Sequence, residues 1–428
     1  MALDTENGIT PYDAPEKDLY EVGELPPLGY VPKKMYAWAI RRERQGEPDQ
    51  AMQLEVVDVP TLDSHEVLVL VMAAGVNYNG IWAGLGIPIS MFDVHKSDYH
   101  IAGSDASGIV WAVGDKVTRW KVGDEVVIHC NQDDGEDEEC NGGDPMFSPS
   151  QRIWGYETPD GSFAQFTNVQ AQQLMPRPKH LTWEESACYT LTLATAYRML
   201  FGHRPHTLKP GQNVLVWGAS GGLGSYAIQL INTAGANAIG VISEEDKRDF
   251  VMQCGAKGVI NRKDFNCWGQ LPTVNTPEYN EWFAEVRKFG KAIWDITGKG
   301  ENVDMVFEHP GEATFPVSTF VCKKGGMVVI CAGTTGYNLT MDARYVWMHQ
   351  KRIQGSHFAH LKQASAANKL MIEGRLDPCM SECFTWDEIP AAHVKMRRNE
   401  HKPGNMAVLV QSPRTGLKTV EDVLSAGK

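Results

Sequence analysis

The sequence lacks the patterns that identify secreted, membrane-spanning or nucleic-acid-binding proteins. Its 428 residues include nine cysteines but no Cys-x-x-Cys pair, which indicates free thiols in a reducing compartment. No apolar run reaches the ~20 residues that a membrane helix needs, and the N-terminus has no basic-then-apolar signal. Positive charge is scarce, since 40 Lys and Arg stand against 53 Asp and Glu, a net charge of −13. This balance argues against nucleic acid or an anionic membrane as partner, and we expect a soluble cytoplasmic protein.

The chain is too long for one ordinary core, and its length favours two domains. Residues 1–32 are rich in Pro, Gly, Asp and Glu, which predicts an arm that lies on another surface or is disordered. Short β-type runs separated by Gly and Asp turns follow, and after about residue 195 strands alternate with helical segments. We therefore predict an α/β protein with a mostly β domain (33–195 and 364–428) and a doubly wound parallel sheet (196–363).

The predicted parallel sheet is interrupted by one long insertion. Its strands are expected at 213–217, 238–243, 258–261, 305–308, 326–331 and 352–356. The segment 263–300 is longer than a normal crossover and should contain a helix from Pro277 to Thr297. Near the C-terminus, the apolar run 407–410 is expected to rejoin the first domain.

A glycine-rich turn follows the first of these strands and opens a helix expected at 225–234. Gly218 allows a tight turn, Gly221 lets the backbone approach a pyrophosphate, and Gly224 lets the helix pack closely on the strand. Amide groups at the start of the helix then face the phosphates. The spacing Gly-x-x-Gly-x-x-Gly departs from the usual Gly-x-Gly-x-x-Gly, but the strand before it and the helix after it favour a dinucleotide site. The residues expected at the cofactor are Gly218, Ala219, Ser220, Gly221, Gly222, Leu223 and Gly224.

The end of the second strand gives a mixed signal for the cofactor's ribose. An NAD enzyme presents an acidic residue there, whereas an NADP enzyme uses small and basic residues. Ser243 stands at the strand end, acidic residues 244–246 follow, and Lys247 and Arg248 come next. The two cations suit a 2′-phosphate, although acidic residues are also common at an exposed helix start.

Four separate motifs carry a family resemblance. They are Gly75-Val76-Asn77-Tyr78-Asn79, Ile153-Trp154-Gly155-Tyr156-Glu157-Thr158, Phe307-Glu308-His309-Pro310-Gly311 and Gly355-Ser356-His357-Phe358-Ala359. The order of the domains resembles the medium-chain dehydrogenase/reductase superfamily, and the four motifs resemble its crotonyl-CoA carboxylase/reductase family. The resemblance covers nearly the whole chain. It implies a GroES-like catalytic domain, a Rossmann domain that binds NADPH, and reductive carboxylation of crotonyl-CoA with CO2 to ethylmalonyl-CoA.

The resemblance also implies roles for single residues. It gives Asn79 the task of binding CO2, and its side-chain amide offers two donors. Glu157 and His357 are similar to the pair that orients a water or a CO2 oxygen, where a carboxylate could raise the imidazole pKa. Tyr156 stands where the family can have Phe, so its ring is expected to shield the pocket. His309 is expected beside the cofactor.

No metal is expected. Zinc enzymes of the superfamily carry Gly-His-Glu where this chain has Gly103-Ser104-Asp105. His129, Cys130 and Cys140 could approach one another, but their spacing fits no zinc motif. The acidic run 133–139 does not match a calcium loop and is expected to be a solvated loop.

A CoA thioester carries phosphates, so an acidic protein needs local basic residues to bind it. The resemblance best supports Arg344. The other candidates, any of which could be ordinary surface charge, are Lys288, Lys291, Arg352 and Lys351.

Two other functions remain open at this point. An enoyl-thioester or quinone reductase without carboxylation shares the fold and the glycine turn but would lack the set of Asn79, Glu157 and His357. A nucleotide-binding protein without turnover would bind NADPH only. Members of the superfamily associate through the edge of the nucleotide-domain sheet, so the resemblance implies a homodimer or homotetramer, and the insertion and the N-terminal arm offer further surface.

Overall fold

The structure is a computed structural model that describes residues 14–426, and it divides into two compact units. The first unit comprises the chain up to Leu191 together with the chain from His360 onward, and the second comprises Thr192–Ala359. The predicted domain boundaries at 195 and 363 lie four residues later in each case. No helix of residues 14–426 is both long and apolar enough to cross a bilayer.

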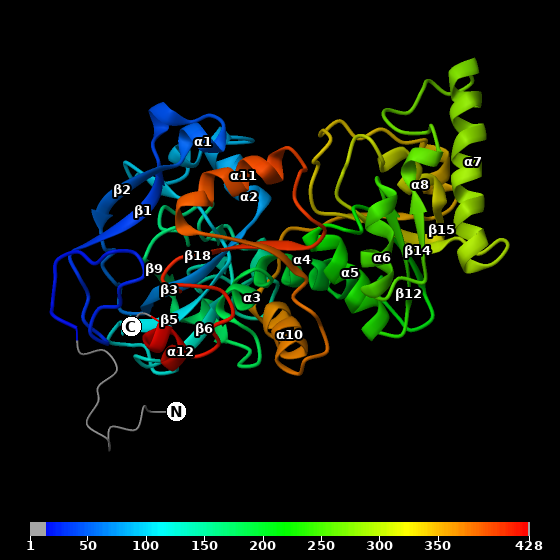
Figure 1. The fold of residues 1–428 in the computed structure, drawn as a ribbon. Coiled ribbons are helices and arrows are strands. Elements are labelled where there is room, and N and C mark those ends of the chain that lie inside the picture. The colour runs from blue at the N-terminus through cyan, green and yellow to red at the C-terminus, as the bar shows by residue number, and fades with distance from the viewer. Residues whose placement is uncertain (1–13, 427–428) are drawn as a thin grey trace. The chain divides into compact units, whose positions relative to one another are not determined.

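The first unit is built mostly from antiparallel strands (Figure 1). Its strands are β1 (Lys34–Ile40), β2 (Gln53–Asp58), β3 (Glu66–Val76), β4 (His100–Ile101), β5 (Ala106–Val113), β6 (Glu125–Ile128), β7 (Asn131–Gln132), β8 (Arg152–Ile153), β9 (Phe166–Gln170), β10 (Leu174–Pro176), β17 (Met380–Phe384) and β18 (Asn405–Leu409). Its helices are α1 (Pro48–Ala51), α2 (Tyr78–Leu85), α3 (Trp183–Ala187), α10 (Leu361–Ile372), α11 (Ile389–Arg397) and α12 (Val420–Ala426).

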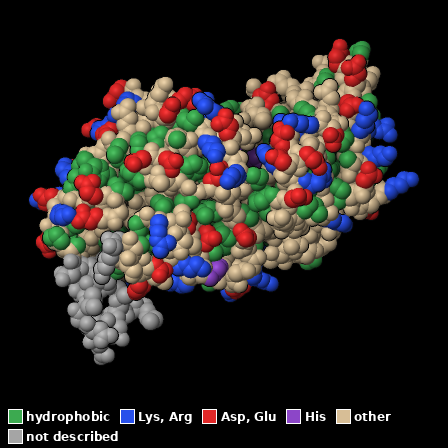
Figure 2. Space-filling view, viewed as in Figure 1, with side chains coloured by type: hydrophobic (Ala, Val, Ile, Leu, Met, Phe, Trp, Pro, Cys, Tyr) green, Lys and Arg blue, Asp and Glu red, His purple; other side chains and the backbone are tan. Residues whose placement is uncertain are grey.

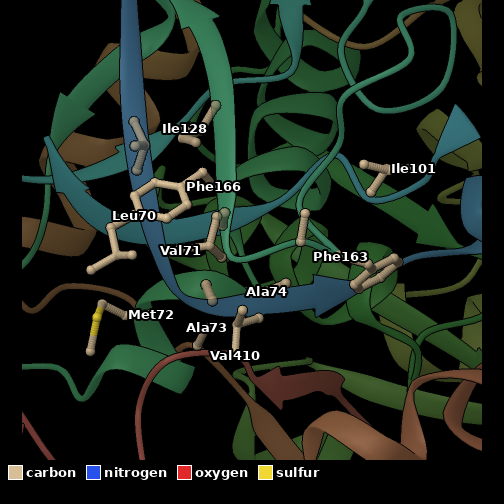
Figure 3. Close-up of a cluster of buried hydrophobic side chains, with 14 of the residues drawn as sticks. Leu70, Val71, Met72, Ala73, Ala74, Ile101, Ile128, Phe163, Phe166 and Val410 are labelled. Carbon is tan, nitrogen blue, oxygen red and sulfur yellow. The ribbon is translucent and has the colours of Figure 1, made fainter. Parts of the chain in front are cut away.

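Strand β3 is the centre of the first unit. Ten of its eleven residues are buried, because both faces of this apolar run are covered. It pairs with β5, β9 and β18, so the predicted run at 407–410 does join this sheet. Figure 3 shows Leu70 and Val71 of β3 with Phe166 of β9 in the resulting core.

The register of β3 and β5 determines what lies at their ends. Ala74 is opposite Ala106, and the N–H of Gly75 donates to the carbonyl of Asp105 across 3.0 Å. Because the strands are antiparallel, the residues after Gly75 and those before Ala106 come together. This pairing places the start of α2 beside the segment 103–105.

The described part of the N-terminal arm lies on the first unit. Tyr20 is 1 % exposed, and its carbonyl accepts from Gln165 Nε2 across 3.1 Å. The carbonyl of Tyr30 accepts from Trp111 Nε1 across 2.7 Å. The rest of the predicted arm, residues 1–13, falls outside the described residues.

The second unit contains a six-stranded, wholly parallel sheet in the order β13-β12-β11-β14-β15-β16. This is the doubly wound arrangement with one reversal of strand order, as predicted. Its strands are β11 (Asn213–Val216), β12 (Asn237–Ile242), β13 (Gly258–Asn261), β14 (Val303–Glu308), β15 (Cys322–Ile330) and β16 (Arg352–Gly355). Its helices are α5 (Gly222–Thr233), α6 (Arg248–Gln253), α7 (Pro277–Thr297), α8 (Phe315–Val321) and α9 (Ala343–Trp347), and α4 (Thr190–Phe201) spans the boundary.

Helix α7 has the predicted bounds but is no peripheral insertion. Its buried face shares one core with β11, β12 and α8, and the ring of Phe289 stacks on that of Trp217 with centroids 5.7 Å apart. Thr276 begins the helix by accepting the N–H of Tyr279, which satisfies one of the free donors of the first turn. The helix thus covers part of one sheet face.

Truncation of Phe289 therefore tests whether α7 belongs to the core. Phe289→Ala should lower the free energy of unfolding by about 3–5 kcal/mol, since it empties a fully buried site. Denaturant unfolding followed by tryptophan fluorescence measures the change. Glu281→Ala, on the exposed side of the same helix, is the control and should stay within about 0.5 kcal/mol of the parent. Equal stability of the two variants would contradict the shared core.

Candidate active site

The glycine turn is closed by contacts on two sides. Gly218 has a φ of +54°, and a Cβ at this position would run into the ring of His309. A Cβ on Gly224 would lie 2.8 Å from the Cα of Ala219, well inside contact distance. Both positions therefore require glycine, one for the turn and one for the approach of α5 to the strand.

The middle of the turn is open, as a bound diphosphate requires. The nearest atom to a Cβ built on Gly221 is 3.5 Å away, and Gly221 is the N-cap of α5. The helix begins at Gly222, three residues earlier than predicted, so Gly222 and Leu223 belong to its first turn. Amides of a first helical turn lack acceptors within the helix and attract anions. The residues present therefore fit the diphosphate of a dinucleotide.

His309 packs against the glycine turn at Gly218. It follows β14, and its Nε2 lies 3.1 Å from the carbonyl of Trp217. Burial lowers the pKa of His309 to about 4, so the neutral ring donates its Nε2 proton to that carbonyl. The predicted cofactor residue is thus in contact with the turn that the cofactor would occupy.

The residue before it, Glu308, is a fully buried carboxyl. Its oxygens accept from the amide of Gly311 across 3.1 Å, from Thr314 Oγ1 across 2.7 Å and from Ser318 Oγ. Burial raises the pKa of Glu308 to about 7, while these donors oppose the rise. Ser318 in turn accepts from Trp217 Nε1, so one network joins the end of β14 to the end of β11.

Two acidic residues after β12, Glu244 and Glu245, are paired with basic side chains. Arg248 pairs with Glu245 and donates to the carbonyl of Val259 across 2.9 Å. Lys263 pairs with Glu244 at 2.5 Å. Lys263, which was not among the predicted residues Lys247 and Arg248, follows the neighbouring strand β13. Since carboxyl ends of parallel strands meet at one sheet edge, the basic pair at 262–263 was a usable signal.

In the first unit, Asn79 lies in the first turn of α2 and is 6 % exposed. Its Nδ2 donates to Ser104 Oγ across 2.7 Å. Its Oδ1 is buried and has no hydrogen-bond partner among the described residues. A buried amide with one satisfied end is oriented but still able to bind a further polar molecule.

The next residue of that segment, Asp105, anchors the start of α2. Its carboxylate accepts from Asn77 Nδ2 across 3.3 Å, from Thr190 Oγ1 and from the amide of Leu191. Burial raises the pKa of Asp105 to about 7. The carboxyl is fully buried, and all of its hydrogen-bond partners described here are neutral.

The loop at 153–158 approaches the same segment. Gly155 has a φ of +70°, and a Cβ there would collide with the carbonyl of Gly103. The amide of Ile153 donates to Glu157 Oε2 across 2.8 Å, and the hydroxyl of Tyr156 donates to the carbonyl of Ile87 across 3.0 Å. Burial raises the pKa of Glu157, while the Ile153 amide opposes the rise. Two predicted site motifs therefore both contact the segment 103–105.

His357 belongs to the second unit and follows β16. Its neighbour Ser356 is fixed by donating its N–H to the carbonyl of Ile330 across 2.8 Å and by a 3.0 Å contact with His203 Nε2. The removal of water by surrounding protein atoms lowers the pKa of His357, and Arg198 adds to this effect. Glu157 belongs to the first unit and His357 to the second, and their pairing stays a prediction.

Comparisons with known proteins match segments of both units. The family model "Alcohol dehydrogenase GroES-like domain" matches residues 63–179, and "Zinc-binding dehydrogenase" matches residues 222–373. A crotonyl-CoA carboxylase/reductase of Cereibacter sphaeroides is 85 % identical over 428 residues, which cover all of both chains. The chain belongs to the crotonyl-CoA carboxylase/reductase family.

Further relatives with related names are similar to this chain over most of its length. A crotonyl-CoA reductase of Streptomyces avermitilis is 42 % identical over 90 % of this chain and 87 % of its own. A solved crotonyl-CoA carboxylase/reductase superposes with a TM-score of 0.94 at 77 % identity, covering 96 % of each chain. Another, AntE in complex with NADP, gives a TM-score of 0.89 at 48 % identity, covering 93 % of this chain and all of its own.

The basic residues predicted for the CoA phosphates do not form one cluster. Arg344 is bound to Asp342 at 2.6 Å and lies 3.3 Å from the hydroxyl of Tyr279, in the first turn of α7. Lys288 and Lys291 lie nine and twelve residues further along this helix, about 14–18 Å at 1.5 Å per residue. Both are exposed, and Figure 2 shows Lys and Arg side chains along the outer side of the region that α7 occupies.

Two other candidates make internal contacts instead. Arg352 donates to the carbonyls of His203 and Arg204 and also to Gln354. Lys351 is 8 % exposed, and its ammonium donates to the carbonyls of Thr319 and Phe320, at 2.7 and 3.2 Å, in the last turn of α8. A lysine in this position stabilises the end of a helix. The sequence could not show this burial, because the carbonyls that bind the ammonium belong to another element, α8.

The possible metal ligands of this family member lie in different surroundings. Cys130 is buried, and the charge of Asp105 helps to raise the pKa of its thiol. Cys140 lies in the acidic loop, where its Sγ and the carboxylates of Asp134 and Asp137 are within 4.8 Å of one another. Both carboxylates accept hydrogen bonds from serines of the same loop.

Substitution of Gly218 should abolish the fit of the turn to NADPH. Gly218→Ala places a methyl group against His309 and should weaken NADPH binding at least about tenfold, or 1.4 kcal/mol, in a fluorescence titration. Gly211→Ala is the matched control: its φ is also positive, +79°, but its Cβ would meet open space. An equal loss of affinity in both variants would show that strain, and not the contact with His309, is responsible.

The buried Lys351 makes stability depend on pH. Burial lowers the pKa of Lys351 from 10.5 to about 8, so the folded protein loses this proton at lower pH than the unfolded chain. The stability of the wild type should therefore rise relative to that of Lys351→Met as the pH increases from about 7.5 to 9.5. Denaturant unfolding at each pH measures this difference, and Lys299→Met, at an exposed site, should show none. Parallel pH profiles of wild type and Lys351→Met would refute the assignment.

Proposed function

We propose that this protein catalyses the NADPH-dependent reductive carboxylation of crotonyl-CoA, and of similar short enoyl-CoA thioesters, to ethylmalonyl-CoA. The observation that carries the proposal is the 85 % identity to a crotonyl-CoA carboxylase/reductase over the whole chain. A solved relative, CinF, is described as a 2-octenoyl-CoA carboxylase reductase in complex with NADP and 2-octenoyl-CoA. The proposed substrate class has the same enoyl-CoA chemistry.

The second unit supplies the residues for the cofactor. The glycine turn at 218–224 would hold the diphosphate, and Ser243, Lys247 and Arg248 would bind the ribose and its 2′-phosphate. NADPH supplies, when bound, a hydride to the β-carbon of the enoyl thioester. The carboxylates that now pair with Arg248 and Lys263 would have to yield to the phosphate.

The first unit supplies the residues that decide the fate of the resulting enolate. Its α-carbon can take a proton or form a carbon–carbon bond to CO2, so the site must exclude water and hold CO2. Asn79 is buried and has one N–H beyond the one donated to Ser104. It would donate to a CO2 oxygen, as a preorganised donor does for developing negative charge. Tyr156 would shield the pocket from water.

Glu157 and His357 would complete the carboxylation site. The fixed carboxylate of Glu157, held by the Ile153 amide, would orient the imidazole of His357 or a water. Neutral imidazole is favoured by the lowered pKa of His357, and a neutral ring is a poor proton donor to the enolate. Arg344 would bind a CoA phosphate through the part of its guanidinium that faces solvent, and Lys288, Lys291 and Arg352 stay weaker candidates.

Three further properties belong to this proposal. The enzyme would work without zinc, since a serine hydroxyl at position 104 bonds to Asn79 where zinc enzymes have an imidazole ligand. It would be a cytoplasmic homodimer or homotetramer. The association is supported by the free edge of strand β16 and by exposed apolar side chains in the preceding segment, among them Tyr337, Trp347 and Met348.

A product analysis tests the reaction. NADPH oxidation with crotonyl-CoA should yield ethylmalonyl-CoA when bicarbonate and carbonic anhydrase are present. Asn79→Ala should shift the product toward butyryl-CoA by roughly tenfold, the effect of about one lost polar contact to a charged state. The rate of NADPH oxidation should change less. Asn280→Ala, an exposed asparagine on α7, is the control.

Two outcomes would contradict the proposal. Butyryl-CoA as sole product of the wild type at saturating CO2 would indicate a plain enoyl-CoA reductase. NADPH binding without any thioester-dependent oxidation would indicate a binding protein.

A further inference from the structure

The carboxamide of Asn79 has one hydrogen bond that fixes its orientation. Its Nδ2 donates to Ser104 Oγ across 2.7 Å, and both side chains are buried. The opposite end of the amide, Oδ1, is buried with no partner among the described residues. Terminal amide torsions have broad minima of about two-fold symmetry, so this hydrogen bond is what restrains the plane of the carboxamide.

Ser104 itself is held on both sides. Gly103 before it has a φ of +104°, and its Cβ position is filled by Ser162 Oγ. Asp105 after it accepts hydrogen bonds from Asn77 and Thr190, and its carbonyl accepts from Gly75. The hydroxyl of Ser104 therefore projects from a fixed piece of backbone and cannot follow a rotation of the Asn79 amide.

We infer that Ser104 is a positioning residue for carboxylation: its hydroxyl holds the Asn79 carboxamide so that the second N–H stays available to CO2. The inference rests on the proposed function, in which Asn79 binds CO2. In this inference the hydroxyl acts through its hydrogen bond to Asn79 and not on the substrate or the cofactor directly. Loss of the hydroxyl leaves the amide free to turn, which lowers the capture of CO2 but not the transfer of hydride.

Removal of the Ser104 hydroxyl tests the proposed positioning role. Ser104→Ala should raise the KM for CO2 and lower the ratio of ethylmalonyl-CoA to butyryl-CoA by roughly threefold to tenfold, the value of one buried hydrogen bond. The KM for NADPH should stay within about twofold. Ser104→Thr keeps the hydroxyl oxygen and should restore much of the product ratio.

A second buried serine, close to Ser104 in the sequence, provides a matched control. Ser107, three residues along, is fully buried and donates its hydroxyl to the carbonyl of Trp183 across 2.6 Å. Ser107→Ala should lower the melting temperature without changing the product ratio. An equal change of ratio in Ser104→Ala and Ser107→Ala would reduce Ser104 to a structural role and overturn the inference.

A double variant separates this inference from the proposed function. If Ser104 acts through Asn79, Ser104→Ala should have no further effect on the product ratio in an Asn79→Ala background. A shift in Asn79→Ala but none in Ser104→Ala would overturn the inference and leave the proposed function standing. No shift in either variant would overturn the role of Asn79 and the inference together.

Discussion

The antiparallel pairing of β3 with β5 is the constraint on which the first unit depends. It buries the longest apolar strand of the unit and also determines which polar residues meet at its end. Gly75 shows how tight this meeting is, because a Cβ there would lie 2.6 Å from the carbonyl of Ala187 and 2.8 Å from the Cβ of Asp105. A slip of the register by one residue would turn every side chain of β3 to the opposite face. The hydrogen bonds between β3 and β5 thus determine both the packing of the core and the polar residues that meet at the end of β3.

Each unit places one fully buried carboxyl beside its functional segment. Asp105 holds the start of α2, and Glu308 holds the segment that follows β14. Both are surrounded by hydroxyl and amide donors, and burial raises the pKa of each to about 7. A charge in such a place is costly unless its hydrogen bonds are complete. The hydrogen bonds to each carboxyl offset part of this cost and fix the adjacent backbone.

The sequence predicted local features well and long-range contacts poorly. The six strands of the parallel sheet and the bounds of α7 follow from periodicity and capping, which act within a few residues. The contact of Ser104 with Asn79 joins positions 25 residues apart and depends on the register of two strands, which periodicity does not reveal. Lys351 is a second example, since burial of a lysine depends on carbonyls supplied by another element. The glycine turn and the helix after it were predictable because they form one continuous segment.

The chain order of the units has a consequence for biosynthesis. The second unit is one continuous stretch, whereas the first needs β18 at Asn405–Leu409 to pair with β3 at Glu66–Val76. A ribosome makes these two strands more than 300 residues apart, and at about 5–20 residues per second that interval lasts from roughly fifteen seconds to about a minute. During this time the apolar edge of β3 has no β18 beside it. The second unit can therefore form while the first unit, which contains Asn79 and Glu157, still lacks β18.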